Sequence, residues 1–344
     1  MTESKPAQTR TLPKAKRAFQ NAIIAWFSEH AEDYPWRRTH DPYAVLVSEL
    51  MLQQTQVATV LGRRYFERWL EQFPNVNTLA DASEDEVLKA WEGLGYYRRA
   101  RNLQKAARVV VEQFDGRFPE KLADILALPG VGRYTAGAVV SFAFDQSVAI
   151  VDANVARVLA RLFDYEGAVD LPAGQQQVWA WAEELVPGDG VRVYNSGLME
   201  LGQKICTVRQ PNCRECPVFA FCATRVPEQL PVKKPRTSTV FVDEHVVFSR
   251  DEDGGILLEQ ETGKRREGLW KLPEASDPPT GKIVLKMQYS ITHYRVTLIV
   301  HEVCDAKSRS GRRFSAAALE AIAMSSPYRK ALVALLANDD FALN

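Results

Sequence analysis

Four cysteines, Cys206, Cys213, Cys216 and Cys222, lie within seventeen residues in the spacing C-x6-C-x2-C-x5-C. Four thiolates this close repel one another unless they share a cation, so the spacing indicates a metal or iron–sulfur site. Zinc sites usually pair their ligands as C-x2-4-C twice, and here only Cys213 and Cys216 form a tight pair. The uneven spacing favours a [4Fe–4S] cluster over zinc. A disulfide framework is the remaining alternative, although such frameworks are typical of short secreted chains.

Length and composition indicate a globular protein of two or three domains. The chain has 344 residues, of which 46% are hydrophobic and 25% charged. Residues 1–17 are polar and basic and lack the apolar core of a signal peptide. No apolar run approaches the ~18 residues that cross a bilayer. We therefore expect a soluble protein in a reducing, cytoplasmic compartment, associated with the nucleoid if the source is bacterial.

The net charge does not indicate a nucleic-acid partner, because 43 basic side chains balance 43 acidic ones. One local run is basic, with Arg98, Arg99, Arg101, Lys105 and Arg108 close together. On its own this run is best interpreted as the solvated face of a helix.

Apolar residues recur at helical spacing from residue 14 to about residue 226. The expected helices cover residues 18–27, 57–73, 84–91, 103–114, 121–126, 134–144, 155–162 and 175–185. Residues 230–239 contain two prolines and several basic side chains, which indicates a linker.

Beyond the linker the pattern changes to short β-branched segments. Residues 240–248, 255–259, 283–287 and 294–303 predict strands, and residues 316–324 and 326–336 predict helices. The expected fold class is therefore a mainly α region followed by a small α+β domain.

Glu49 is the first candidate catalytic residue. Asp41 and Pro42 can begin a helix on which Glu49 lies among apolar residues. Burial of a carboxyl raises its pKa, which produces a general acid at neutral pH. The alternative is a buried ion pair with Arg37 or Arg38.

Asp152 is the second candidate. It ends an apolar run and precedes a predicted helix, so it can accept backbone hydrogen bonds as an N-cap and stay ionised. An ordinary N-cap is the simpler interpretation. One neutral acid and one fixed anion, however, form the pair that cleaves a glycosidic bond.

Two glycine-containing loops add to this pattern. Residues 128–132 (LPGVG) join two helical stretches and can present backbone N–H groups to a phosphate, or form a plain helix–turn–helix corner. Residues 93–97 (GLGYY) place bulky side chains on a bendable loop, and such side chains can unstack a duplex when a base is flipped. Gln54 and Thr55 could then fill the vacated space; core packing is the alternative for each aromatic side chain.

Together these motifs resemble the helix-hairpin-helix DNA glycosylase superfamily, which includes endonuclease III, and within it the MutY family of adenine DNA glycosylases. The matching segments are, in the family's order, the catalytic helix 48–57 (SELMLQQTQV), the intercalating loop 91–97 (WEGLGYY), the hairpin 128–132, the aspartate segment 151–155 (VDANV) and residues 199–202 (MELG) before the cysteines. The resemblance covers roughly residues 18–225.

The resemblance implies a role for each of these positions. Glu49 would be the general acid and base, and Asp152 would stabilise the sugar cation, with Asn154 and Tyr134 arranging it. The four cysteines would bind a [4Fe–4S] cluster. The base pocket would include Trp36, Arg37 and Gln54. The DNA contacts would come from Thr55, Leu94, Tyr96, Gly130, Val131 and Gly132.

The resemblance also extends to the C-terminal residues. Residues 257–260 (LLEQ) and 268–273 (GLWKLP) are similar to the Nudix-like domain with which this family recognises 8-oxoguanine, but the acidic cluster of a Nudix hydrolase is missing. Thr292 and His293 would contact the lesion. Ile291 and Thr292 replace a Phe-Ser pair that many members carry, which reduces the apolar wedge there.

The implied boundaries are a tail over residues 1–15, a glycosylase domain over 16–228, a linker over 229–239 and the Nudix-like domain over 240–344. Within the glycosylase domain the six-helix barrel would span about 38–146. The iron–sulfur module would combine 16–37 with 147–228.

The expected activity is monofunctional excision of adenine opposite 8-oxoguanine or guanine in double-stranded DNA, by a monomer. Lyase-active relatives carry a lysine where this chain has Tyr134, so no Schiff base is expected. The alternatives are an endonuclease III-like glycosylase/lyase that acts on oxidised pyrimidines and a non-catalytic iron–sulfur DNA-binding protein.

Overall fold

The computed structural model describes residues 15–235, 237–263, 265–275, 278–303 and 311–337. The expected tail before residue 15 therefore lies outside the described residues. By the packing of its backbone the chain forms two compact units, Met1–Gln53 with Val109–Pro235 and Gln54–Arg108 with Arg236–Asn344. The domain boundaries expected from the sequence stay a prediction, since compactness groups residues 54–108 with the C-terminal region.

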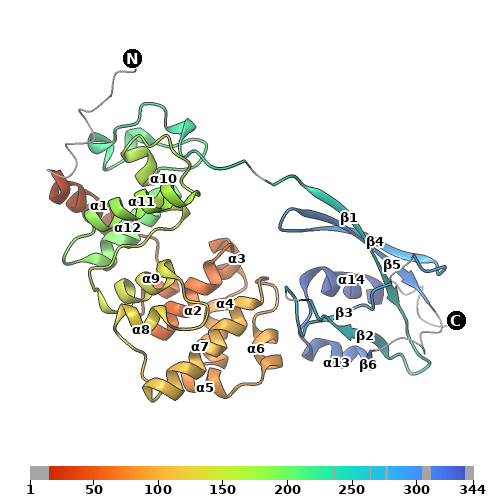
Figure 1. The fold of residues 1–344 in the computed structure, drawn as a ribbon. Coiled ribbons are helices and arrows are strands. Elements are labelled where there is room, and N and C mark those ends of the chain that lie inside the picture. The colour runs from red at the N-terminus through yellow and green to blue at the C-terminus, as the bar shows by residue number, and fades with distance from the viewer. Residues whose placement is uncertain (1–14, 236, 264, 276–277, 304–310, 338–344) are drawn as a thin grey trace. The chain divides into compact units, whose positions relative to one another are not determined.

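The first unit is helical (Figure 1). Its helices are α1 (Lys16–His30), α2 (Pro42–Leu52), α8 (Leu122–Leu126), α9 (Arg133–Phe144), α10 (Ala153–Leu162), α11 (Pro172–Leu185) and α12 (Val191–Lys204), together with a 3₁₀ turn at Pro35–Arg37. Helix α12 packs against α1, α9 and α10, and α2 packs against α9. Two further 3₁₀ turns, Cys213–Glu215 and Phe219–Phe221, lie in the cysteine segment.

Close helix packing in this unit depends on small residues. A Cβ at Gly197 of α12 would lie 2.8 Å from the Ile23 side chain of α1, and a Cβ at Gly202 would lie 2.7 Å from the Asn154 Cβ. Since neither distance is tolerated by real Cβ atoms, both glycines let α12 approach its neighbours closely.

The second unit begins with the short helices α3 (Val57–Gly62), α4 (Tyr65–Gln72), α5 (Val76–Asp81) and α6 (Glu84–Ala90). Helix α7 (Arg98–Phe114) runs across the boundary between the units. The single helix expected over residues 57–73 is wrong, because Arg64 takes a left-handed φ of 50° and separates α3 from α4.

The C-terminal region of this unit holds two three-stranded sheets. In the first, β1 (Val240–Phe248) runs parallel to the central β5 (Tyr294–Glu302), which pairs antiparallel with β4 (Ile283–Ile291). In the second, the central β2 (Ile256–Gln260) pairs antiparallel with β3 (Trp270–Lys271) and β6 (Arg312–Phe314). Helix α14 (Ser326–Ala337) packs on β4, and α13 (Ala316–Ala321) packs on β6. The predicted fold class, a mainly α region followed by a small α+β region, is confirmed.

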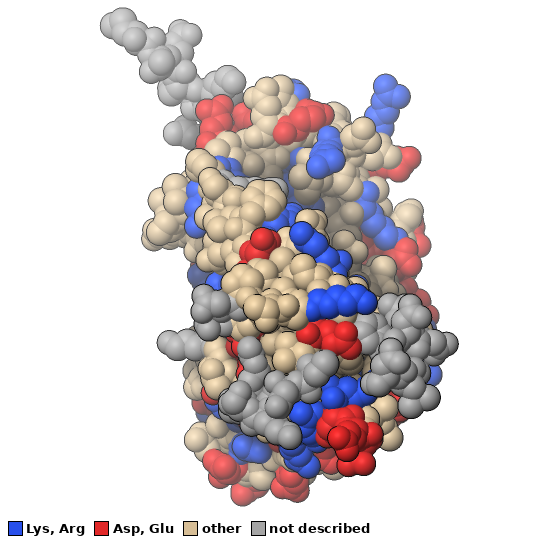
Figure 2. Space-filling view, turned by 90° about the vertical axis from the view of Figure 1, so that its right-hand side faces the viewer, with Lys and Arg blue, Asp and Glu red and all other residues tan. Residues whose placement is uncertain are grey.

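Surface charge is mixed on the face that Figure 2 presents, where basic and acidic side chains are interspersed. This agrees with the balanced composition. Among the described residues, no helix is both long and apolar enough to span a membrane.

Candidate active site

Glu49 lies on a helix that is buried almost all round. Asp41 caps α2 by accepting the Tyr43 N–H at 3.0 Å, and Pro42 occupies the first position, as the sequence predicted. Only 6% of Glu49 is exposed, so its predicted burial is confirmed. Burial raises the pKa of this carboxyl to about 7, the charge of Asp152 adds to the rise, and a hydrogen bond from Tyr134 opposes it. A substantial fraction of Glu49 therefore carries a proton at neutral pH.

The alternative interpretation, a buried ion pair of Glu49 with Arg37 or Arg38, is wrong. Arg37 pairs instead with Glu200, whose side chain is fully buried. Arg38 pairs with Asp33, with 2.7 Å between Nε and Oδ1. Both cations are therefore engaged by other carboxylates, and neither lowers the pKa of Glu49.

A cavity of about 60 Å³ lies beside Glu49. Its lining residues are Trp36, Arg37, Val45, Ser48, Glu49, Leu52, Phe142, Arg192, Ser196 and Met199. The cavity brings Glu49 together with Trp36 and Arg37, two of the three residues expected around the base. A volume this small holds water but not a purine, because ligand pockets usually exceed about 300 Å³.

Sequence reasoning did not find Phe142, Arg192 or Met199. Arg192 fixes the rim of the cavity, since its guanidinium donates to the backbone carbonyls of Arg37 at 2.6 Å and Thr39 at 2.8 Å. These partners lie about 150 residues away and are backbone atoms, so no local pattern marks the position.

Asp152 is the N-cap of α10, as predicted. Its Oδ1 accepts the Val155 N–H at 2.6 Å, and its Oδ2 accepts the Asn154 side-chain amide at 2.8 Å. The direction of its pKa shift differs from the expectation, because burial raises the pKa and outweighs the hydrogen bonds from the Val155 N–H and from the side chain and backbone of Asn154, as well as the charge of Arg157. The cap site is buried, whereas the expectation assumed an ordinary, solvated cap.

Tyr134 joins the two carboxyls. It lies on α9, and its hydroxyl interacts with both Glu49 and Asp152. Burial and these two charges raise the pKa of Tyr134 well above its ordinary range, so the hydroxyl remains a hydrogen-bond donor to Glu49. The structure thus brings Glu49, Asp152, Asn154 and Tyr134 into one constellation.

The hairpin before α9 provides fewer bare amides than expected. Gly130 takes a φ of 76°, which favours glycine, and the Val131 N–H is engaged by the Leu128 carbonyl at 3.1 Å. Gly132 occupies the N-cap position of α9 and has no side chain with which to cap it. The first amides of α9, rather than that of Val131, are therefore suited to an anion.

Arg157 connects the aspartate segment to the cysteine segment. Its Nη2 donates to Asn154 Oδ1 at 2.9 Å and to the Gly202 carbonyl at 2.6 Å, and its Nε donates to the Cys206 carbonyl at 2.8 Å. Since Arg157 is only 6% exposed, these bonds form in a low-dielectric environment, where they are strong.

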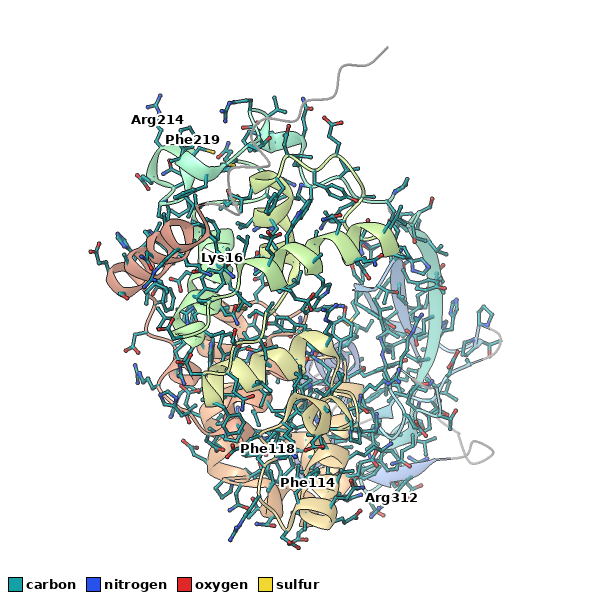
Figure 3. All side chains as sticks on the ribbon, turned by 60° about the vertical axis from the view of Figure 1, so that its left-hand side comes forward. Lys16, Phe114, Phe118, Arg214, Phe219 and Arg312 are labelled. Atoms are coloured by element: carbon teal, nitrogen blue, oxygen red, sulfur yellow. The ribbon has the colours of Figure 1, made fainter. Side chains whose placement is uncertain are left out.

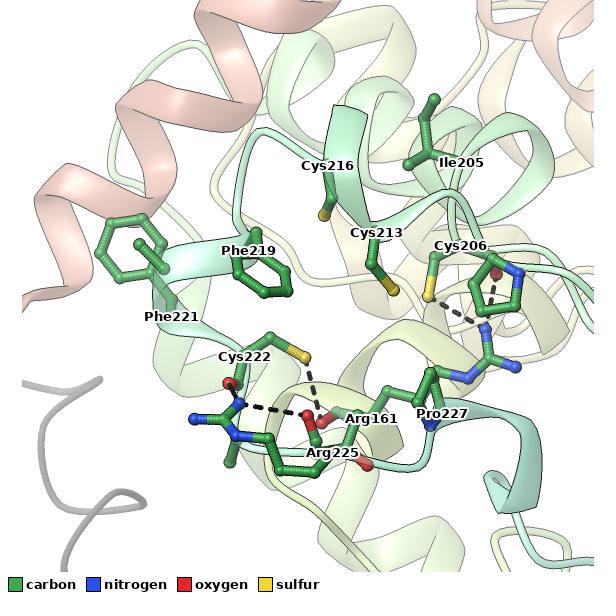
Figure 4. Close-up of a pocket in the computed structure, with 14 residues that line it drawn as sticks. Arg161, Ile205, Cys206, Cys213, Cys216, Phe219, Phe221, Cys222, Arg225 and Pro227 are labelled. Atoms are coloured by element: carbon green, nitrogen blue, oxygen red, sulfur yellow. Dashed lines mark hydrogen bonds between the residues drawn. The ribbon is translucent and has the colours of Figure 1, made fainter.

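The four cysteines surround a second cavity, of about 610 Å³ (Figure 4). Arg161, which is 1% exposed, places its Nη1 3.2 Å from Cys206 Sγ. The Cys222 thiol in turn donates to the Arg161 carbonyl at 3.4 Å.

The four cysteine thiols that line this cavity are the donor type that an iron–sulfur cluster would use. Within the part of the chain that the structure describes, no three His, Cys, Asp or Glu side chains converge on one ion position. The four thiols surround a volume instead. Burial raises the pKa of Cys216 to about 12 and that of Cys222 to about 11, so these thiols need a bound cation to ionise.

The basic residues in and just before the cysteine segment differ in exposure and in ion pairing. Lys204, the last residue of α12, pairs with Glu32 and Glu200. Arg214 and Phe219 are exposed, and Figure 3 shows them at the outer side of the cysteine segment.

The loop at residues 93–97 lies in the second unit and adopts unusual backbone angles. Gly93 and Gly95 have φ values of 100° and 69°, and Tyr96, which is not a glycine, has a φ of 48°. Tyr96 is 50% exposed, whereas Leu94 is 5% exposed. Tyr96 is therefore the side chain of this loop that can reach a partner, and a contact of Leu94 with DNA stays a prediction.

Arg99 holds this loop from inside. Its Nη2 donates to the carbonyls of Leu94 at 3.1 Å and Gly95 at 3.0 Å and to Thr55 Oγ1 at 3.3 Å. The solvated helix face expected for the basic run is wrong for Arg99, which is 8% exposed and whose pKa burial lowers to about 10. Gln54, which precedes Thr55, takes a positive φ of 56° one residue beyond the C-cap of α2.

Thr292 and His293 form the turn between β4 and β5. Thr292 is exposed and has a φ of 53°, a strained conformation for a β-branched residue. A groove of about 690 Å³ lies next to the turn, with Ile291, Tyr294 and Arg265 among its lining residues. The turn and groove are a candidate surface for base recognition.

Known proteins resemble the helical region. Residues 47–183 match the HhH-GPD superfamily of base excision DNA repair proteins. The human adenine DNA glycosylase is 45% identical over 222 residues, which are 60% of this chain and 39% of the human protein. The adenine DNA glycosylase of Buchnera aphidicola subsp. Baizongia pistaciae (strain Bp) is 33% identical over 257 residues, 74% of this chain and 71% of that protein. The chain spans about two fifths of the length of the mammalian relatives.

Solved structures share the fold. A thermostable thymine-DNA glycosylase superposes with a TM-score of 0.56 at 33% identity, covering 62% of this chain and 97% of that one. A non-covalent endonuclease III–DNA complex superposes with a TM-score of 0.52 at 23% identity, covering 63% and 97%. The coverage of the Buchnera protein and the superfamily match place the chain in a family: it belongs to the adenine DNA glycosylases of the helix-hairpin-helix superfamily.

Proposed function

We propose that this chain is a monofunctional DNA N-glycosylase that excises adenine paired with 8-oxoguanine or guanine. The observation that carries the proposal is the buried carboxyl of Glu49. This carboxyl has a pKa of about 7 and interacts with Asp152 and Tyr134. A proton donor at neutral pH next to a second carboxyl is what cleavage of an N-glycosidic bond requires.

Glu49 protonates the departing adenine and then, as a carboxylate, activates the attacking water. Tyr134 orients the carboxyl through its hydrogen bond. The cavity beside Glu49 has room for water, and it must widen to admit a base, so side chains such as Trp36 and Arg37 move when adenine enters. Gln54 completes the base pocket in this proposal.

Asp152 stabilises the positive charge that develops on the sugar. Its two oxygens are fixed by the Val155 N–H and by Asn154, so the carboxylate needs little reorganisation when the charge forms. Because Tyr134 offers a hydroxyl and no amine, a Schiff base with the sugar is not formed. This distinguishes the proposal from the endonuclease III-like glycosylase/lyase alternative.

Double-stranded DNA is the proposed partner of a monomeric protein. Tyr96 enters the base stack, with Thr55 supporting the gap, and a contact of the buried Leu94 with DNA requires the loop to move. The hairpin at Gly130, Val131 and Gly132 places the first amides of α9 against a backbone phosphate. Thr292 and His293 read 8-oxoguanine opposite the extruded adenine. In this proposal the C-terminal domain resembles a Nudix domain that recognises a base.

Cys206, Cys213, Cys216 and Cys222 hold a [4Fe–4S] cluster in this proposal. When bound, the cluster offsets the charge of the thiolates and fixes residues 206–222 into one rigid segment. We expect a Cys213→Ser variant to lose iron, folding and DNA affinity before it loses the bond-breaking step. Iron analysis and binding to a DNA duplex measure this, and a folded variant that binds DNA normally would contradict it.

Single-turnover assays test the activity. Duplexes carry adenine opposite 8-oxoguanine, adenine opposite guanine, thymine glycol, or thymine opposite guanine; the last is included because a thymine-DNA glycosylase shares the fold. We expect release of adenine and no adduct on borohydride trapping. Release of thymine glycol with an adduct would support the lyase alternative, and no release from any duplex would support a non-catalytic DNA-binding protein.

A further inference from the structure

Both ends of the loop at residues 93–97 are attached to the C-terminal region of the same compact unit. Glu92 precedes the loop, and its side chain is 15% exposed. Arg329 of α14 binds it through two bonds, with 2.6 Å between Nε and Oε1 and 3.2 Å between Nη2 and Oε2. Such a bidentate pair fixes orientation as well as distance.

Arg329 is itself held in place from the C-terminal side. Its Nη1 donates to the Leu319 carbonyl and its Nη2 to the Ile322 carbonyl, each at 2.7 Å. The guanidinium therefore bridges the end of α13 and the start of the loop. Lys89 adds a second cation to the same carboxylate, with its Nζ 2.7 Å from Glu92 Oε2.

Tyr97 anchors the other end of the loop. It is 3% exposed, and its hydroxyl donates to the Met324 carbonyl at 3.0 Å. Met324 is fully buried in the core of the C-terminal region, where its backbone also pairs with Trp270. The acceptor is therefore rigid.

Between these two anchors the loop backbone adopts positive φ angles, and at Tyr96 such an angle is energetically unfavourable. Tyr96 has a φ of 48°, which a free loop would relax, since left-handed conformations cost non-glycine residues roughly 1 kcal/mol or more. Arg99 restrains the loop carbonyls from inside, and the two anchors fix where the loop begins and ends. The strained, half-exposed Tyr96 is held by groups that are buried, Tyr97 and Arg99, or partly buried, Glu92 and Arg329.

We propose that residues 322–329 brace the loop at residues 93–97, so that Glu92, Tyr97 and Arg329 are positioning residues for base extrusion. This inference rests on the proposed function, in which Tyr96 enters the base stack. The C-terminal region then acts on adenine excision through the loop as well as through any contact with the opposite base.

The test uses the full chain with the double substitution E92Q and Y97F. Both changes nearly preserve side-chain volume. They remove the hydroxyl that reaches Met324 and the charge that Glu92 shares between Arg329 and Lys89. A matched control is R313M, which breaks an Arg–carboxylate pair in the same region, 3.5 Å from Arg313 Nε to Asp251 Oδ2, away from the loop. Three quantities are measured: the single-turnover excision rate, the affinity for a duplex with an abasic-site analogue, and the thermal midpoint.

We expect the excision rate of E92Q/Y97F to fall by about tenfold or more, because misplaced catalytic elements cost rates of this order. Affinity for the abasic duplex should stay within about twofold of the wild type, since that duplex holds no target base to extrude. The control should match the wild type in both, and R329M should reproduce the loss of rate.

If E92Q/Y97F excised adenine at the wild-type rate, the brace would be overturned. It would also be overturned if the variant lost excision rate, affinity for the abasic duplex and thermal midpoint together, because such losses indicate a purely structural role. A wild-type protein that releases no adenine would instead overturn the proposed function, and the brace with it. The two failures are therefore distinguishable.

Discussion

Replacing Glu49 by glutamine should stabilise the protein at alkaline pH while abolishing excision. The folded-state pKa of Glu49 is about 7, against 4.5 for an ordinary glutamate. Between these values the native state retains a proton that the unfolded chain loses, so stability falls as pH rises through this window. The substituted amide carries no charge to desolvate and avoids that loss.

The magnitude follows from the two pKa values. They differ by about 2.5, and each unit corresponds to about 1.36 kcal/mol, which gives about 3 kcal/mol at pH 8 for a side chain that is 6% exposed. The advantage of E49Q should be about 2 kcal/mol at pH 6 and near zero at pH 4, where wild-type Glu49 is neutral in both states. In a unit of this size, 3 kcal/mol corresponds to a rise of roughly 6–12 °C in the thermal midpoint.

The assay compares thermal midpoints of E49Q and wild type from pH 4 to pH 8 at one scan rate, with single-turnover excision measured alongside. Glu200 provides the control, since it is equally buried but paired with Arg37. E200Q removes the carboxylate that pairs with Arg37 and should therefore lower the thermal midpoint at pH 8. A difference between E49Q and wild type that does not vary with pH would refute the raised pKa, and full excision by E49Q would refute the acid role.

Two further predictions concern the second unit. R99M should reduce the excision rate by about tenfold or more, because the carbonyls of the loop at residues 93–97 and Thr55 lose their shared hydrogen-bond donor. The control R98M, at an exposed neighbouring position, should not reduce it. Equal single-turnover rates for the two variants would contradict this prediction. T292N should raise stability by up to about 1 kcal/mol because asparagine tolerates the positive φ at this turn, and an unchanged or lower thermal midpoint would argue against strain there.

The sequence predicted helices and strands well where the apolar residues of an element are also its buried residues. The strand at Tyr294–Glu302 ends within one residue of the predicted bounds because most of its apolar residues, among them Val296, Ile299 and Val300, are buried. Helix α12 was not predicted, because its buried face includes Asn195, Ser196, Gly197 and Glu200, which interrupt the apolar pattern. These residues are buried because α1 packs closely on them and Arg37 neutralises Glu200, neither of which is a local property.

The same distinction applies to the candidate site. Glu49 and Asp152 were found because each violates a local expectation, a carboxylate on an apolar helix and an acid at the end of an apolar run. Arg192 was not found, because its partners are backbone carbonyls of a distant segment. The pKa direction of Asp152 was missed for a related reason, since the sequence indicates a cap but not how deeply tertiary packing buries it.

The high pKa of Glu49 depends on which carboxylate the neighbouring Arg37 pairs with. Arg37 lines the same cavity, and an unpaired guanidinium there would stabilise the Glu49 carboxylate and lower its pKa. Glu200 counters this by pairing with Arg37, while its Oε1 also accepts the Glu32 N–H at 3.1 Å. The acid in this site is therefore maintained by a second carboxylate that takes no part in the reaction. In E200Q, which retains Glu49, the alkaline limb of the pH–rate profile should consequently move to lower pH, whereas a purely structural Glu200 would reduce the rate equally at every pH.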